Sequence, residues 1–128
     1  MVDTLIAEDY EACESQDPSI EDMLVGMSQR TGTAAVIQTG LTNALFGNDI
    51  HSLIYVQGDM AYEHICVGKT TLFVEKGRVT VQIGGKELNL SRGDSMKFPM
   101  FGEYKLTSEY GAVVAEKCRV PKNYFDVN

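Results

Sequence analysis

The sequence has no tryptophan, three prolines and three cysteines, Cys13, Cys66 and Cys118. An odd number of cysteines without paired spacing is typical of a reducing compartment and argues against a disulfide framework. The N-terminus lacks both the basic start and the apolar run of a signal peptide, and no stretch approaches the roughly 20 apolar residues of a membrane span. These absences predict a cytoplasmic protein that does not enter a membrane.

Positive charge is scarce at the start of the chain. Residues 1–30 contain eight acidic residues and one base, Arg30, and the net charge of the whole chain is −7. Nucleic acid and anionic lipid both require a basic surface, so neither is expected as a partner. The acidic start is interpreted as the solvated face of a helix. The 128 residues, 44% of them hydrophobic, are sufficient for one domain with its own core.

One helix is predicted, in the segment DPSIEDMLVGMSQRTG. Asp17 or Ser19 can cap its first turn, Pro18 is tolerated there, and Gly32 lies just beyond its end. Its apolar face is expected to consist of Ile20, Met23, Leu24 and Met27. The first sixteen residues are compatible with a short helix, an arm, or a strand shared with a second subunit.

From Thr33 onward, short runs rich in Val, Ile, Thr, Tyr and Phe alternate with Gly, Asn and Asp, which is typical of strands joined by tight turns. Gly84-Gly85 predicts a two-residue hairpin turn with positive φ at both residues. Ten short strands without intervening helices indicate an antiparallel sandwich or barrel. They are expected at residues 34–39, 43–46, 51–57, 61–66, 70–75, 78–83, 86–90, 95–98, 104–108 and 112–119.

The region from Gly58 to Ser108 resembles the two-part signature of the cupin superfamily in its spacing. The first cupin motif contains a glycine, two histidines, a glutamate and a second glycine. At the corresponding positions this sequence has Gly58, His64, Cys66, Thr70 and Gly77. The glycines and the first histidine match, whereas the second histidine and the glutamate are replaced.

The second cupin motif contains glycine, proline, glycine, histidine and asparagine. The corresponding residues here are Gly93, Pro99, Phe101, Tyr104 and Ser108. The resemblance implies an all-β, antiparallel double-stranded β-helix, also called a cupin or jelly-roll barrel, formed by residues 33–128 after an N-terminal arm and helix at residues 1–32. It also implies a homodimer, since small cupins commonly pair through edge strands or arms. The arm at residues 10–13 and the tail PKNYFDVN are the candidate pairing segments.

Residues two apart on a strand share a face, so Tyr62, His64 and Cys66 are expected to point together, and the cupin register directs them into the barrel. In metal cupins three imidazoles and one carboxylate meet there. Here the four positions are occupied by His64, Cys66, Thr70 and Tyr104, of which only the first two are plausible metal ligands. No cofactor is therefore expected, and the predicted ligand-binding residues are Tyr62, His64, Cys66, Thr70 and Tyr104.

These positions predict a cupin-like protein that binds a small molecule of the sugar or organic-acid type and has lost the usual metal centre. One alternative is a metal-dependent isomerase, lyase or oxygenase that uses His64 and Cys66, helped by His51 or Glu63. Another is a structural subunit of a larger assembly. Whether the protein is an enzyme stays open; without a metal, His64 is the natural proton-transfer residue, with Tyr104 as its partner acid.

Overall fold

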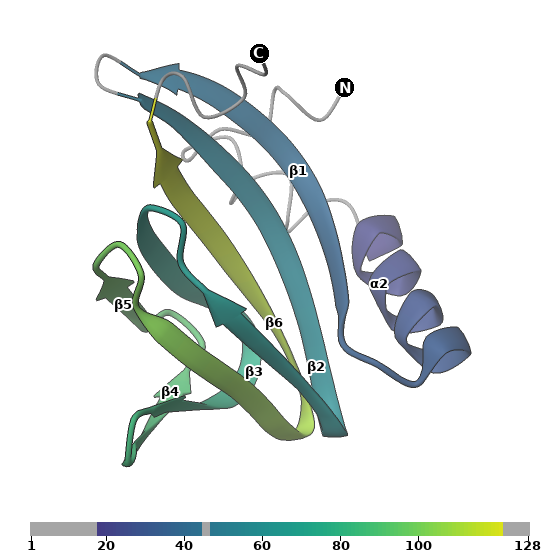
Figure 1. Ribbon diagram of the computed structural model, residues 1–128. Helices are drawn as coiled ribbons and strands as arrows, with labels where there is room; N and C mark the ends of the chain where they lie inside the picture. Colours follow the sequence, from purple (N-terminus) through teal and green to yellow (C-terminus); the bar gives the residue numbers. More distant parts are fainter. Residues whose placement is uncertain (1–17, 45–46, 122–128) are drawn as a thin grey trace.

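The computed structural model describes residues 18–44 and 47–121 (Figure 1). Every strand pairing in this part of the chain is antiparallel, and one helix precedes the strands, which confirms the predicted all-β fold. The elements in chain order are α2 (Pro18–Thr31), β1 (Ala35–Ala44), β2 (Gly47–Ile65), β3 (Lys69–Ile83), β4 (Lys86–Ser91), β5 (Ser95–Phe98) and β6 (Glu103–Val120). The predicted arm at residues 10–13 and most of the C-terminal tail lie outside the described residues.

The prediction of ten short strands is wrong, because three of the strands are long and bent. β2, β3 and β6 have 19, 15 and 18 residues. The glycines at which the sequence suggested chain breaks are instead points inside or beside these strands where the pairing register shifts. Gly58, Gly77 and Gly111 all have positive φ there. Glycine therefore bends a continuing strand here rather than ending it.

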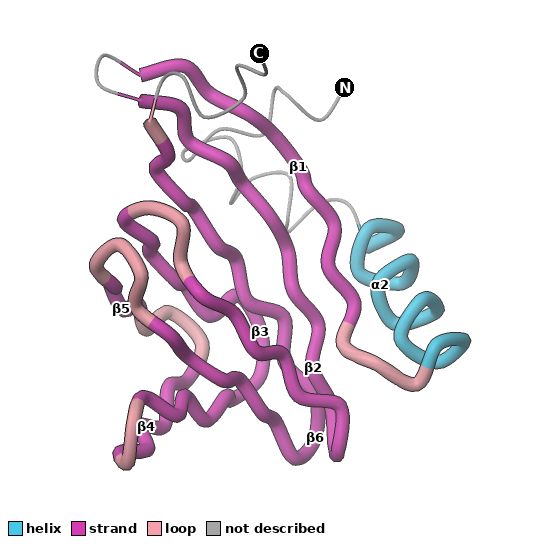
Figure 2. The backbone as a smooth tube through the Cα atoms, in the orientation of Figure 1, coloured by secondary structure: helices cyan, strands magenta, loops and turns pink. Residues whose placement is uncertain are grey.

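Each long strand contributes one segment to each of two layers, as the register of the pairings shows. In the first layer, β6 residues 112–120 lie between β2 residues 48–56 and β3 residues 69–77, with β1 and β5 at the outside. In the second layer, β6 residues 103–108 lie between β2 residues 58–65 and β3 residues 80–82, with β4 beyond. Figure 2 shows the strands curving from one layer into the other.

The bend of β3 lies directly against the bend of β6. Gly77 has φ +79°, and a Cβ atom added to it would lie 2.3 Å from the carbonyl oxygen of Gly111. Any side chain at residue 77 would therefore be both strained and in collision with the neighbouring backbone. The match between Gly77 and the second glycine of the first cupin motif has this steric cause.

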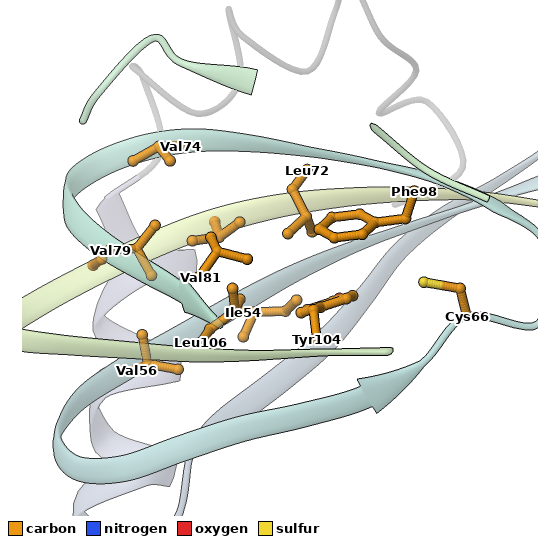
Figure 3. Close-up of a cluster of buried hydrophobic side chains, with 12 residues drawn as sticks. Ile54, Val56, Cys66, Leu72, Val74, Val79, Val81, Phe98, Tyr104 and Leu106 are labelled. Atoms are coloured by element: carbon orange, nitrogen blue, oxygen red, sulfur yellow. The ribbon is translucent and has the colours of Figure 1, made fainter. Parts of the chain in front are cut away.

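The interior between the layers is filled by apolar side chains from both (Figure 3). Leu72, Val74 and Val114 come from the first layer, whereas Val81 and Leu106 come from the second, and all five are fully buried. Phe98 and Tyr104 lie at one end of this cluster, beside Cys66. The polar part of the interior begins at that end.

Helix α2 packs on the outer face of the first layer, and Figure 1 shows it beside β1. Leu24 is fully buried there against Leu53, Tyr55 and Val113. The helix ends at Thr31 and is followed by Gly32, as predicted. Ile20 and Met27 pack against the same cluster.

The prediction of the apolar face is wrong for one residue, because the Met23 side chain is 51% exposed. Val25 and Ser28 lie on the packed side of the helix instead. An ion pair of 2.8 Å between Lys76 Nζ and Glu21 Oε2 joins the helix to the bend of β3. The helix therefore contacts the barrel close to the point where its two layers meet.

The hairpin between β3 and β4 is confirmed, because Ile83 pairs with Lys86 across the two glycines. The prediction of positive φ at both glycines is wrong, since only Gly84 has it, at +59°. That pattern is typical of a type II′ turn, in which the first central residue alone requires positive φ. Among the described residues, no helix is long and apolar enough to cross a membrane.

We expect Gly77→Ala to lower the free energy of unfolding by roughly 2–5 kcal/mol, because it combines a left-handed backbone with overpacking. Urea denaturation followed by circular dichroism measures the loss. Gly85→Ala is the matched control: no atom lies within 4 Å of its added Cβ, and the change is expected to stay within about 0.5 kcal/mol. Equal stability of the two variants would contradict the steric role of Gly77.

Candidate functional site

The alternation of side chains along β2 and the residue that follows it brings three predicted site residues to the interior. Tyr62 packs against the interior cluster and Cys66 belongs to it. His64 Nε2 lies 3.8 Å from Oε2 of Glu116, a buried residue of β6, and the His64 side chain is 28% exposed. His64 therefore connects the buried interior with solvent at the end of the barrel.

Tyr104 lies on β6 directly opposite His64 in the β2–β6 register. Its hydroxyl donates a hydrogen bond to Oε2 of Glu116, and its ring stacks on Phe98 with 4.8 Å between centroids. The rings of Tyr62, His64 and Tyr104 form a triangle with centroid separations of 5.7, 5.7 and 6.1 Å. Three of the predicted residues thus form one aromatic cluster around a carboxylate.

Glu116 is the site residue that the sequence analysis missed. It is 7% exposed and lies opposite Leu72 on one neighbouring strand and Ser52 on the other. The signal was present in the alternation of β6, because Ala112 and Val114 point inward and Glu116 is the next residue in that series. A charged residue at an inward position of a strand is uncommon and marks a site of interest.

Thr70 and Cys66 complete the predicted set, but each is engaged with the protein itself. Thr70 is buried, and its hydroxyl donates to the carbonyl oxygen of Gly68 at 3.0 Å. Burial raises the pKa of the Cys66 thiol, although the hydrogen bond with Thr70 partly opposes this shift. A thiol that resists ionisation is a weak nucleophile and a poor metal ligand. The site therefore presents Cys66 as a neutral group.

The two tyrosines are also held in their neutral form. Burial raises the pKa of Tyr104, and the negative charge of Glu116 raises it further. The same two causes, in the same order, raise the pKa of Tyr62. Both phenols therefore serve as hydrogen-bond donors rather than as acids near neutral pH.

Two turns meet beside Cys66 at the end of the barrel. The Cys66 amide donates to the carbonyl oxygen of Gly102 at 2.8 Å, and the Phe101 amide donates to the carbonyl oxygen of Cys66 at 2.7 Å. Phe101 has φ +65°, a conformation that favours glycine, the usual residue at this position of the second cupin motif. Its ring is 73% exposed at the rim of the site.

A surface hollow of about 610 Å³ adjoins this cluster. His64 and Tyr104 are the members of its wall that also contact Glu116. The wall consists of Glu63, His64, Ile65, Gln82, Gly84, Glu103, Tyr104 and Lys105. The cluster therefore borders a space in which a small molecule can lie.

Two further residues that the sequence suggested as auxiliary ligands point away from the barrel interior, although Glu63 lies on the wall of the hollow. His51 shares the outer face of β2 with Leu53 and Tyr55, and its Nε2 lies 3.1 Å from the hydroxyl oxygen of Thr42. Glu63 is exposed and alternates with the inward residues Tyr62 and His64. Neither can join His64 in the barrel interior.

The usual metal of cupins does not fit these residues. Thr70 and Tyr104 both use their hydroxyl hydrogens within the protein, and Cys66 resists ionisation. Within residues 18–44 and 47–121, no group of three or more His, Cys, Asp or Glu side chains is arranged to hold a metal ion. His64 and Glu116 alone provide two of the three or four protein ligands that such sites require.

Comparison with solved structures identifies the fold. The cupin domain of an XRE-family transcriptional regulator from Enterobacter cloacae has a TM-score of 0.61 and 12% identity, with 70% of this chain and 99% of that one covered. The chain has the cupin fold. A cupin superfamily protein from Desulfitobacterium hafniense has a TM-score of 0.58 and 10% identity, with 69% and 78% covered.

A cupin-2 domain protein from Shewanella frigidimarina is similar to the same degree, with a TM-score of 0.54, 13% identity and 66% and 79% of the two chains covered. No protein-family model and no curated protein sequence matches the chain. At these identities the cupin fold is shared while side chains differ at most positions. The shared fold therefore accounts for the barrel alone. The function of this protein depends on the side chains that its own sequence places there.

The raised pKa of Tyr62 and Tyr104 predicts a loss of stability in alkali. Unfolded tyrosine ionises near pH 10 whereas these two stay neutral in the fold, so their contribution is complete below pH 10 and decreases as the pH rises further. We expect the free energy of unfolding to fall with a slope that increases toward about 1.4 kcal/mol per pH unit for each phenol as the pH passes 10. Urea denaturation between pH 9 and 11 measures the slope.

Tyr104→Phe removes one of the two phenols and should therefore reduce the slope of the unfolding free energy against pH by the contribution of that phenol. Tyr110→Phe is the control and should leave the slope unchanged, because that ring is 85% exposed. Equal slopes in the wild type and Tyr104→Phe would show that Tyr104 ionises in the folded protein as readily as in the unfolded one.

Proposed function

We propose that this protein binds a small polar molecule at the end of its barrel, through His64, Tyr104 and Glu116, and that it does so without a metal. The contact of Tyr104 and His64 with one buried carboxylate carries the proposal. Tyr62 packs beside these residues, whereas Cys66 and Thr70 are buried behind them and do not line the hollow. Sites for small molecules typically combine an apolar wall with a few fixed polar groups, as this arrangement does.

The chemistry of the replaced ligands supports binding over metal catalysis. A metal at this position would compete with Glu116 for Tyr104 and with the carbonyl oxygen of Gly68 for Thr70. The neutral state of Cys66 and Tyr104 also removes them as anionic ligands. The raised pKa of Tyr104 likewise makes it an inefficient proton donor to a substrate.

Between the two ligand classes that the sequence suggested, sugars fit better than organic acids. Glu116 places a negative charge inside the barrel, and a bound carboxylate would lie close to it. A neutral sugar or polyol can instead donate hydroxyl hydrogens to Glu116 and accept from the tyrosine hydroxyls. In the metal-free site that we propose, such hydrogen bonding is the main source of specificity.

We further propose that the protein acts in the cytoplasm as a homodimer. Cys66 and Cys118 are both buried free thiols, which suits a reducing compartment.

The free edge of β1 supports the dimer. β1 pairs with β2 on one side, and in the described part of the chain its other edge has no strand partner. Val36 and Leu41 on this strand are 39% and 41% exposed. An apolar edge of this kind is a surface on which a second copy can pair.

Light scattering on the purified protein is expected to give twice the chain mass of 14.1 kDa. Leu41→Lys places a charge on the β1 edge and should shift the mass toward that of one chain. Glu109→Lys, a charge change on an exposed residue of β6, is the control and should leave the dimer intact. A single-chain mass for the unmodified protein would contradict the dimer.

Binding is tested by thermal unfolding in the presence of neutral sugars and polyols, together with elemental analysis of the purified protein. A ligand at about 100 times its dissociation constant should stabilise the fold by roughly 2.7 kcal/mol. His64→Ala and Tyr104→Phe should remove this stabilisation. His51→Ala should retain it, because His51 lies on the opposite face of β2.

A stoichiometric transition metal in the purified protein would overturn the metal-free site. Stabilisation that survives His64→Ala would place the bound molecule elsewhere.

A further inference from the structure

Negative charge predominates around the candidate site. The wall of the hollow carries the carboxylates of Glu63 and Glu103 and one ammonium group, that of Lys105. Although Glu63 and Lys105 are opposite each other in the register, no ion pair joins them. Glu116 adds a third carboxylate behind His64 and Tyr104. A cation in this hollow is therefore favoured over an anion of equal size.

The carboxylate of Glu116 has unused capacity to accept hydrogen bonds. Its Oε2 accepts from Tyr104 and lies near His64, whereas within the described part of the chain its Oε1 has no donor. The side chain is only 7% exposed, so water replaces a missing donor incompletely. Apart from His64, no basic side chain of the described residues contacts it. A buried carboxylate in this state favours a positively charged hydrogen-bond donor.

The aromatic rings provide a second attraction for the same kind of group. The Tyr62 and His64 rings stack at an interplanar angle of 17°, and Tyr104 is tilted by 49° and 59° against them. The three centroids are 5.7–6.1 Å apart, so a cation at the side of the cluster that the rings share can contact more than one of them. The faces of tyrosine rings attract cations that lie within about 6 Å.

We propose that the ligand of this site carries a protonated or alkylated ammonium group, which binds between the Glu116 carboxylate and the rings of Tyr62, His64 and Tyr104. The inference rests on the proposed function and specifies the charge of its ligand. A sugar or polyol that also carries an amine satisfies both the proposed function and this inference. The carboxylate supplies charge and an acceptor, and the rings supply a wall that excludes water.

Three compounds of one shape and different charge test the proposal: tert-butylammonium, tert-butanol and pivalate. Their binding is followed by NMR titration of protein with ¹³C-labelled tyrosine and histidine rings. We expect tert-butylammonium to bind at least about tenfold more tightly than tert-butanol, from cation–π attraction and the charged hydrogen bond together. Pivalate should bind most weakly.

Glu116→Gln should reduce the preference for tert-butylammonium over tert-butanol to the share that the rings provide, because it removes the charge and keeps an acceptor for Tyr104. Glu109→Gln is the matched control: it removes one charge from an exposed residue of the same strand and should preserve the preference. Tyr62→Leu tests the rings separately and should lower the affinity for tert-butylammonium more than that for tert-butanol.

Equal binding of the charged and neutral compounds would overturn the ammonium inference and leave small-molecule binding intact. An undiminished preference for the cation in Glu116→Gln would also overturn it. If none of the three compounds moves the ring signals, the inference fails. The proposed function fails with it only if neutral sugars and polyols leave the same signals unchanged.

Discussion

The close contact of two bent strands is the constraint on which the rest of this barrel depends. β3 and β6 bend side by side, with the backbone of Gly77 against the carbonyl oxygen of Gly111. Because both strands continue beyond the bend, each of them contributes one segment to the first layer and another to the second. The relative placement of Glu116 and Tyr104, which lie on β6 on either side of its bend, follows directly from this contact.

The interior of the barrel separates an apolar part from a polar end. Fully buried aliphatic residues such as Leu72 and Val81 occupy the space behind Phe98 and Tyr104. Glu116 can remain in this interior because Tyr104 donates a hydrogen bond to it and His64 lies beside it. Hydrogen bonding thus accounts for the presence of this carboxylate in an otherwise apolar interior.

Much of the architecture could be predicted from the sequence because it depends on local patterns. The glycines, Pro99 and the strand alternation gave the cupin spacing, and comparison with solved cupins confirmed that fold. The number of strands was wrong because positive φ at Gly58, Gly77 and Gly111 has the same sequence signal in a bend as in a turn. Met23 was misplaced because helical periodicity alone does not determine which edge of a wide apolar stripe faces the sheet.

The candidate site was predicted less completely than the fold. Motif spacing identified His64 and Tyr104, which the structure brings together with Tyr62. It missed Glu116, because that residue lies outside both cupin motifs and approaches them only through the register of β6 with β2 and β3. A contact that depends on long-range strand pairing has no signal at a fixed sequence separation. The inward position of Glu116 could nevertheless have been predicted from the alternation of side chains along β6.

The two sides of the site differ in how firmly the sheet holds them. β6 has a strand partner on both sides, so Tyr104 and Glu116 stand on a central strand. β2 residues 58–65, which carry Tyr62 and His64, pair with β6 alone in the described part of the chain. Backbone amides on the outer edge of that segment should exchange hydrogen faster than those of β6. An incoming molecule thus meets one rigid wall and one that can adjust its position.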